Sequence, residues 1–152
     1  MVEKIVDILD KRGKTITFAE SCTGGKLAST FVEVAGVSKV FDGSIISYSN
    51  EIKSKWLGVK KDTLIRYGAV SHECVNEMLN GALKLANSNY AVAISGIAGP
   101  SGGSRDKPVG TVFIGVKGEE RVVIKRFLFN GDRVFIQNQA VYSAILLLKN
   151  IL

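Results

Sequence analysis

The chain has 152 residues, of which 46% are hydrophobic and 22% charged, and its formal net charge is +6. This ordinary globular composition argues against disorder, and the length fits one domain over residues 1–152. No apolar run approaches the roughly 18 residues of a membrane span, and Met1–Asp7 lacks the apolar region of a signal peptide. We therefore expect a cytoplasmic protein without a membrane partner.

The first quarter of the chain predicts a helix, a strand and a second helix. Apolar residues recur at helical spacing over residues 2–12, and Gly13 is a typical helix stop. Residues 15–18 form a short β-rich run that predicts the first strand. Residues 20–25 interrupt the pattern, and helical spacing resumes over residues 26–34.

The middle of the chain predicts one strand followed by three helices. Residues 44–49 (Ser-Ile-Ile-Ser-Tyr-Ser) indicate the second strand. Asn50 is expected to cap a helix over residues 51–57, and a short helix follows over residues 62–67. Ser71 is expected to cap a third, longer helix.

The last third predicts a strand over residues 90–95, a glycine-rich loop over 96–110 and a final helix that Asp132 caps. Residues 111–116 and 121–129 between them indicate a hairpin. Early alternation of strands and helices predicts parallel strands covered on both faces, and the hairpin adds an antiparallel element. The expected fold is therefore α/β, a three-layer α/β/α sandwich with a mostly parallel, mixed central sheet.

Polar residues follow each of the three expected parallel strands, at the edge where open α/β sheets bind ligands. These residues are Glu20, Ser21 and Thr23 after the first strand, Tyr48 and Asn50 after the second, and Ser95 and Gly96 after the third. Lys53 lies one turn into the next helix. The sequence thus predicts one cleft that gathers hydroxyls, a phenol, a lysine and a glycine-rich loop.

Ser21 lies between a strand and a helix that begins with Gly24 and Gly25. Glycines at this place let a ligand approach the backbone, and free amides at a helix start favour negative charge or a developing oxyanion. Ser21 is accordingly a candidate nucleophile. The alternative is that Ser21 or Thr23 only caps the helix.

A serine nucleophile needs a base. His72, the only histidine, stands at a helix start, where a surface or capping role is the simpler interpretation. Tyr48 and Lys53 are the other candidates, because an ammonium beside a phenol lowers the phenol pKa and burial lowers a lysine pKa. The alternative places Tyr48 in the core and Lys53 in solvent.

The sequence alone leaves the roles of several other residues undecided. Cys22 at the helix start is a rival nucleophile, although a thiol in this setting is more often a small buried hydrophobe. Cys22 and Cys74 could form a disulfide, but we expect free thiols in a cytosolic chain. The glycines at 96, 99, 102 and 103 suit backbone approach to a substrate, but they match neither phosphate-binding nor dinucleotide-binding motifs. Arg133 and Lys107 are candidate phosphate ligands or ordinary surface charges. One histidine and two cysteines cannot make a four-ligand zinc site, so we expect no metal and no cofactor.

Five motifs in order resemble the CinA C-terminal domain family, over about residues 2–150. They are Ala-Glu-Ser-Cys-Thr-Gly-Gly at 19–25, Tyr-Ser-Asn-Glu-Ile-Lys at 48–53, Gly-Ala-Val-Ser at 68–71, Gly-Ile-Ala-Gly-Pro at 96–100 and Lys-Pro-Val-Gly-Thr-Val at 107–112. The enzymatic members of that family are nicotinamide mononucleotide (NMN) deamidases. The resemblance implies a stand-alone form and, by analogy, a homodimer.

The resemblance implies hydrolysis of the NMN carboxamide to nicotinic acid mononucleotide and ammonia, without a cofactor. Matched by motif, Ser21 is the nucleophile, and Tyr48 and Lys53 activate it. Ser95 replaces a common threonine, Ser101 replaces a common aspartate, and Arg133 falls in a segment that supplies a basic residue near the substrate.

The competing hypothesis is a non-catalytic nucleotide-sensing or DNA-associated module linked to competence or DNA damage. The basic charge supports this hypothesis. Single-strand binding would favour a basic stripe with interleaved aromatic residues, and the sequence contains none, so we do not expect a nucleic-acid partner. A third hypothesis is an amidase that uses Cys22.

Overall fold

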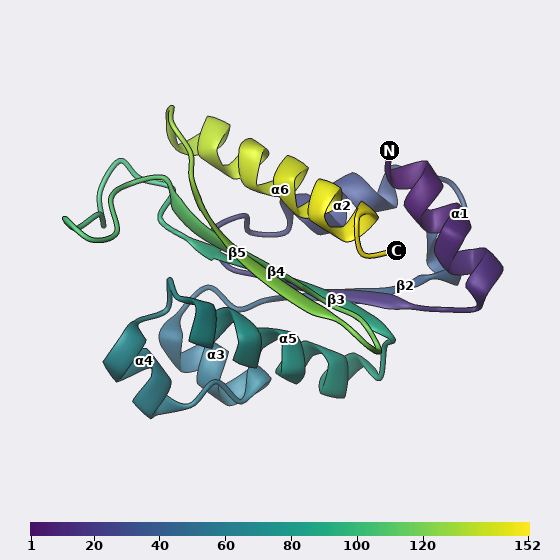
Figure 1. Cartoon of the computed structure of the whole chain (residues 1–152), viewed down its shortest axis with the longest axis horizontal. Helices are drawn as coiled ribbons and strands as arrows, with labels where there is room; N and C mark the ends of the chain where they lie inside the picture. Colours follow the sequence, from purple (N-terminus) through teal and green to yellow (C-terminus); the bar gives the residue numbers. More distant parts are fainter.

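The computed structural model describes residues 1–152 and shows a five-stranded sheet between two layers of helices (Figure 1). The strands are β1 (Ile16–Glu20), β2 (Phe41–Ile46), β3 (Tyr90–Gly96), β4 (Thr111–Lys117) and β5 (Val122–Leu128). The helices are α1 (Val2–Arg12), α2 (Lys26–Val32), α3 (Asn50–Leu57), α4 (Lys61–Tyr67), α5 (His72–Ala86) and α6 (Arg133–Lys149), with a 3₁₀ turn at Val37–Lys39.

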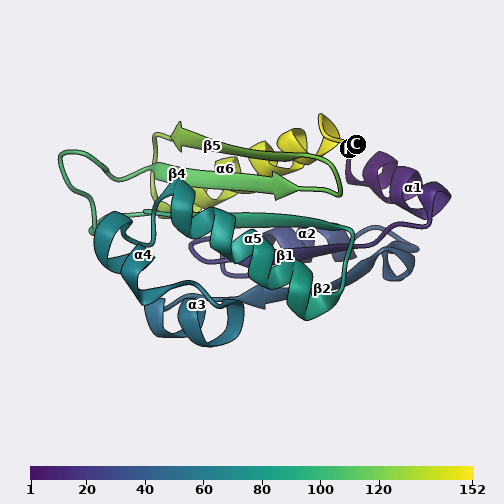
Figure 2. The same ribbon diagram turned by 60° about the horizontal axis from the view of Figure 1, so that its bottom comes forward.

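The sheet is mixed and mostly parallel. Its order is β2-β1-β3-β4-β5, with β1 parallel to both β2 and β3, and β4 antiparallel to both β3 and β5. Only β4 therefore runs against the other strands, as the arrows in Figure 2 show for β4 and β5. The predicted α/β/α sandwich is confirmed.

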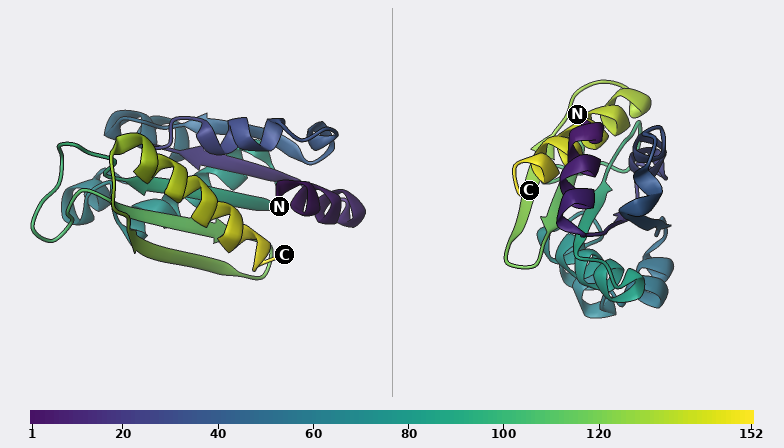
Figure 3. Two further views of the ribbon diagram at one scale, coloured as in Figure 1. Left: turned by 90° about the horizontal axis from the view of Figure 1, so that it is seen from above. Right: turned by 90° about the vertical axis from the view of Figure 1, so that its right-hand side faces the viewer.

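Each face of the sheet has its own core. α1, α2 and α6 lie on one face, where Ile16 and Phe18 of β1 join a cluster of 24 buried residues (Figure 3). α3, α4 and α5 lie on the other, where Ala19, Ala91 and Ala93 join a cluster of 10. β1 is buried along its whole length because helices cover both of its faces, which explains its lack of apolar–polar alternation.

Two helix caps agree with the sequence and one differs. Ser71 Oγ accepts from the amide of Cys74 at 3.1 Å, and Asp132 accepts from the amide of Phe135 at 2.8 Å, as predicted. The α3 cap is Ser49, whose Oγ accepts from Ile52 N at 3.2 Å, so the prediction of Asn50 as the cap was wrong by one residue.

The second strand was predicted three residues too late. β2 begins at Phe41, whose ring lies 4.8 Å from that of Phe18, and ends at Ile46. The amide of Ser47 still donates to the carbonyl of Glu20 in β1 at 2.9 Å. The carbonyl oxygens of Ser47 and Tyr48 instead accept from Lys53 Nζ, so the regular strand ends at Ile46 although the next residues are β-rich.

Candidate active site

A cleft of about 260 Å³ lies at the carboxyl ends of the parallel strands β1, β2 and β3. This is the edge predicted from the sequence. The lining residues come from the loops after β1, β2 and β3 and from the start of α6, and they include Ser21, Cys22, Tyr48, Asn50, Lys53, Ser95, Gly96, Gly99, Gly102 and Arg133. The predicted convergence is therefore observed for most of the candidate residues.

Ser21 and Lys53 are in direct contact at the base of the cleft. Lys53 Nζ lies 2.9 Å from Ser21 Oγ, 2.8 Å from the carbonyl oxygen of Ser47 and 3.2 Å from that of Tyr48. A neutral amine has two hydrogens and one lone pair. Its two hydrogens can go to the two carbonyls, which leaves the lone pair facing the Ser21 hydroxyl.

The surroundings of Lys53 favour the neutral amine. The side chain is 1% exposed and forms no salt bridge. Burial lowers the pKa of Lys53 below its ordinary value, and only the nearby thiols of Cys74 and Cys22 act in the opposite direction. Those thiols oppose the shift only when ionised, and burial raises the pKa of each to about 11. At neutral pH they are uncharged, so the desolvation of Lys53 prevails.

Tyr48 does not occupy the place that either sequence interpretation gave it. Its side chain is 58% exposed, so it is not in the core. Its hydroxyl accepts from Arg133 Nη2 at 2.7 Å, and it is the carbonyl of Tyr48, not the phenol, that contacts Lys53. The expected phenol–ammonium pair is therefore absent. Arg133 also donates to the carbonyl of Gly99 at 2.6 Å, so it ties two cleft loops to α6.

The backbone amides at the start of α2 donate to a side chain of the protein itself, Glu20. The Glu20 carboxylate, which is fully buried, accepts from the amides of Gly25, Leu27 and Ala28 at 2.9–3.1 Å. Thr23 Oγ1 and Ser44 Oγ donate to the same carboxylate at 2.8 and 3.2 Å. A carboxylate at a helix start satisfies amides and complements the helix dipole.

This arrangement gives no support to the substrate-binding role predicted for Thr23, Gly24 and Gly25. None of the three lines the cleft, the Gly25 amide is already bonded to Glu20, and the Gly24 amide donates to Ser21 O at 3.0 Å. The amides of Cys22 and Thr23 remain, since neither donates to another residue of the protein. These two amides are therefore better placed than those of the two glycines to donate to the oxyanion that forms when Ser21 Oγ attacks a carbonyl.

Cys22 lines the cleft but is poorly suited to attack. Burial raises the pKa of its thiol to about 11, so the thiolate is scarce at neutral pH. Cys22 and Cys74 are both free, as expected, and both are buried, which was expected of Cys22.

The glycine-rich loop forms one wall of the cleft. Ser95 is buried and donates to the carbonyl of Ala69 at 2.8 Å, which brings the Ala69–Val70 segment to the cleft as well. A Cβ on Gly96 would lie 2.7 Å from Val112 Cγ2, so only glycine fits there. Gly103 lies outside the lining residues, packed on the backbone of Val109, so the cleft gives no support to its predicted contact with a substrate.

Two other candidates also lie outside the cleft. Lys107 donates to the carbonyl of Tyr67 at 2.6 Å and does not line the cleft. His72 is exposed at the start of α5. Arg133 is thus the one candidate phosphate ligand at this site.

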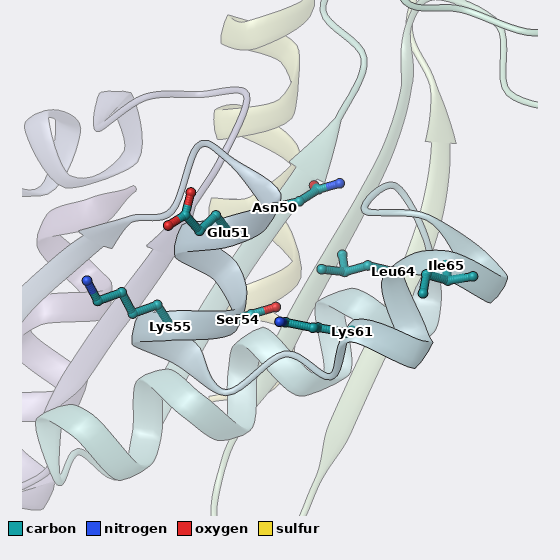
Figure 4. Close-up of a pocket in the computed structure, with 7 residues that line it drawn as sticks. All are labelled: Asn50, Glu51, Ser54, Lys55, Lys61, Leu64 and Ile65. Carbon is teal, nitrogen blue, oxygen red and sulfur yellow. The ribbon is translucent and has the colours of Figure 1, made fainter.

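A larger groove of about 680 Å³ runs between α3 and α4 and shares Asn50 with the cleft (Figure 4). Its side chains do not converge on one point. Lys61 and Leu64 extend toward α3, whereas Glu51 and Lys55 extend to the opposite side of that helix. The groove therefore lacks the gathered polar groups that characterise the smaller cleft.

No three His, Cys, Asp or Glu side chains gather where they could hold a metal ion. None of the helices combines the length and apolar character needed to cross a membrane.

Comparison with known proteins identifies relatives along the whole chain. The family model described as "CinA C-terminal domain" matches residues 1–152. A CinA-like protein of Fervidobacterium nodosum is 50% identical over 149 residues, which is 98% of this chain and 36% of that protein. A CinA-like protein of Thermotoga maritima is 50% identical over 151 residues, 99% of this chain and 36% of that protein. The chain thus spans about a third of the length of these curated relatives.

Solved structures share the fold closely. The competence/damage inducible protein CihA of Agrobacterium tumefaciens superimposes with a TM-score of 0.95 at 37% identity, covering 98% of this chain and 92% of that one. A competence-damaged protein (CinA) superfamily protein of Escherichia coli gives a TM-score of 0.96 at 32% identity, covering 99% and 88%.

Proposed function

The chain belongs to the CinA C-terminal domain family, and from that premise we propose that it is an amidohydrolase that deamidates NMN through Ser21 and Lys53. One observation carries the proposal: a fully buried lysine without an acidic partner holds its nitrogen 2.9 Å from the Ser21 hydroxyl. A desolvated lysine is one of the few side chains that can act as a base toward serine near neutral pH.

In the proposed first step the Lys53 lone pair takes the Ser21 proton. The Ser21 oxygen forms a bond to the carboxamide carbon, and the carbonyl π electrons move onto its oxygen, next to the free amides of Cys22 and Thr23. When the tetrahedral intermediate collapses, the carbon–nitrogen bond breaks. The Lys53 ammonium returns its proton to the leaving nitrogen, which departs as ammonia.

In the second step a water molecule attacks the acyl-enzyme while Lys53 takes one of its protons. Collapse of this intermediate breaks the bond to the Ser21 oxygen and regenerates the hydroxyl with the proton from Lys53. The net reaction converts the amide and water into a carboxylic acid and ammonia, and no cofactor is consumed.

Substrate choice is proposed to depend on Arg133 at the mouth of the cleft. Its guanidinium now holds the carbonyl of Gly99 and the hydroxyl of Tyr48, and the same fork geometry suits a phosphate. Arg133 is thus proposed to bind the 5′-phosphate of NMN, with Tyr48 as a binding residue rather than the base. Ser95, Gly96, Gly99, Gly102 and Asn50 are proposed to border the nucleoside.

The deciding experiment measures ammonia release from NMN by the purified protein, with Ser21→Ala and Cys22→Ala beside it. We expect release that Ser21→Ala abolishes and Cys22→Ala preserves within about threefold, and none from nicotinamide. If ammonia release is lost in Cys22→Ala and retained in Ser21→Ala, the nucleophile is the Cys22 thiol and not the Ser21 hydroxyl. No release from folded wild type, together with salt-sensitive DNA binding, would favour the non-catalytic DNA-associated module.

A further inference from the structure

The two peptide groups that follow Ser21 have their carbonyl ends bonded and their amide ends free. Ser21 O accepts from the Gly24 amide at 3.0 Å, and Cys22 O accepts from Gln137 Nε2 at 2.8 Å. The amides of Cys22 and Thr23 donate to no other residue of the protein. Because a trans peptide is planar with its C=O and N–H pointing in opposite directions, holding the oxygen also fixes the direction of the amide.

Gln137 reaches this turn from a distant part of the chain. It lies on α6, 115 residues from Cys22, and the side chain is half-buried between α6 and the turn. Its neighbours Ile136 and Ala140 are buried in the core on that face of the sheet, so the helix cannot shift freely. The hydrogen bond from Gln137 therefore restrains the peptide next to Ser21 by linking it to the packed helix α6.

We propose that Gln137 is a positioning residue for the oxyanion site at Ser21. By holding the Cys22 carbonyl, it keeps the Thr23 amide, which belongs to the same peptide group, aimed at the substrate oxygen that becomes negative when Ser21 attacks, beside the Cys22 amide, whose own peptide is held by Gly24. Its hydrogen bond also polarises the Cys22–Thr23 peptide, which strengthens the free amide as a donor. This inference rests on the proposed function, in that it takes Ser21 as the nucleophile.

The test uses Gln137→Glu, which keeps the shape but loses the donor when ionised, and Gln137→Met, which loses the donor without adding charge. Gln139→Glu is the matched control. Gln139 lies on the same helix and also donates through Nε2 to a backbone carbonyl, but that carbonyl belongs to Asn130. Circular dichroism and thermal unfolding establish that all variants are folded.

Two measurements are made on each protein. The first is NMN turnover, separated into kcat and KM. The second is the affinity for pyridine-3-boronic acid, whose boron accepts an electron pair from the Ser21 oxygen as the proton passes to Lys53. The resulting tetrahedral boronate carries a negative charge and reports the oxyanion site without requiring turnover.

We expect both Gln137 variants to lower kcat and boronate affinity by about 10-fold to 100-fold, less than the loss of a donor itself, with KM within about threefold. Gln139→Glu should behave as wild type. Unchanged kcat and boronate affinity in the Gln137 variants would overturn the inference. Boronate binding by wild type without NMN hydrolysis would refute the proposed substrate while the boronate series still decides the role of Gln137. If the wild type neither hydrolyses NMN nor binds the boronate, Ser21 is not the nucleophile, and the inference about Gln137 is refuted as well.

Discussion

At the scale of single residues, Lys53 is the group on which the chemistry depends. A nitrogen that is buried among two carbonyls and a hydroxyl has no acid to stabilise its charge, and burial lowers its pKa. The base must be neutral to accept the Ser21 proton. The neutral fraction rises with pH, and a lowered pKa brings that rise closer to neutrality.

We therefore predict that log kcat increases with pH with a slope near one below the lowered pKa of Lys53 and levels off above it. Lys53→Arg should abolish turnover, by about 10³-fold or more, because a guanidinium stays protonated. Lys55→Arg, an exposed lysine on the same helix, should leave kcat and the profile unchanged. Turnover by Lys53→Arg close to that of wild type, or a kcat that falls as pH rises from about 6 to 8, would show that Lys53 is not the base.

Glu20 is the second residue that the site depends on. Its carboxylate accepts five hydrogen bonds, three of them from backbone amides at the start of α2. Glu20→Gln replaces one accepting oxygen with an NH₂ group that must face a backbone N–H. We predict a loss of about 1–3 kcal/mol in the free energy of unfolding, measured with urea.

Ser44→Ala is the control for Glu20→Gln, because it removes one neutral donor and keeps the carboxylate with its amides. It should cost only about 0.5–1.5 kcal/mol. If Glu20→Gln were as stable as wild type, the carboxylate would not be what holds the start of α2.

The sequence could predict the proximity of Ser21 and Lys53, because both follow parallel strands that end at one edge. It could not predict the use of the Glu20 carboxylate. Glu20 is the last residue of a strand, and its helix amides lie five to eight residues later, so no local capping pattern marks it. Gln137 was missed for a similar reason, since only the packing of α6 brings it to Cys22.

At the scale of elements, helices were well predicted where local signals decide them. α1 matches its predicted bounds because Gly13 adopts the left-handed conformation that ends it, with φ of 61°. The end of β2 was not predictable in the same way, since no local pattern shows that the carbonyls of Ser47 and Tyr48 accept from the Lys53 side chain. The parallel order of β2, β1 and β3 followed from the alternation of strands with helices.

Gly81 sets the place of the helix that carries Lys53. A Cβ at Gly81 in α5 would lie 2.0 Å from the carbonyl oxygen of Leu57, the last residue of α3. We predict that Gly81→Ala lowers the free energy of unfolding by about 1–3 kcal/mol, because backbone must move to admit the methyl.

The same substitution should lower kcat by about 10-fold, because moving α3 shifts Lys53 relative to Ser21. Lys84→Ala, exposed and three residues along α5, should change neither stability nor kcat measurably. Loss of stability with kcat unchanged would show that the Ser21–Lys53 contact does not depend on how α3 rests on α5.

At the scale of the whole molecule, the candidate cleft lies where both helix layers meet the end of the sheet. α3 contributes Lys53 from one layer, and α6 contributes Arg133 from the other. In the free protein Arg133 bridges this mouth through the Gly99 carbonyl and the Tyr48 hydroxyl. A ligand that contacts both residues would link the two layers and stabilise the molecule as a unit.

This arrangement gives a prediction that requires no turnover. In Ser21→Ala, NMN at about 100 times its Kd should add about 2.7 kcal/mol to the free energy of unfolding. For a chain of this size, that corresponds to a rise in Tm of roughly 5–11 °C in a thermal scan. Nicotinamide, which lacks the ribose phosphate, should give little shift at the same concentration.

A substitution of Arg133 tests whether the Tm shift depends on a phosphate bound at this residue. Adding Arg133→Ala to Ser21→Ala should weaken NMN binding about 10-fold or more and reduce the Tm shift, because the phosphate loses its charged partner. If NMN binding is unchanged in this variant, the phosphate binds elsewhere. The groove between α3 and α4 is then the alternative site. Its lysines, Lys55 and Lys61, form no salt bridges, and Asn50 connects it to the cleft, so Lys61→Ala would then reduce the shift instead.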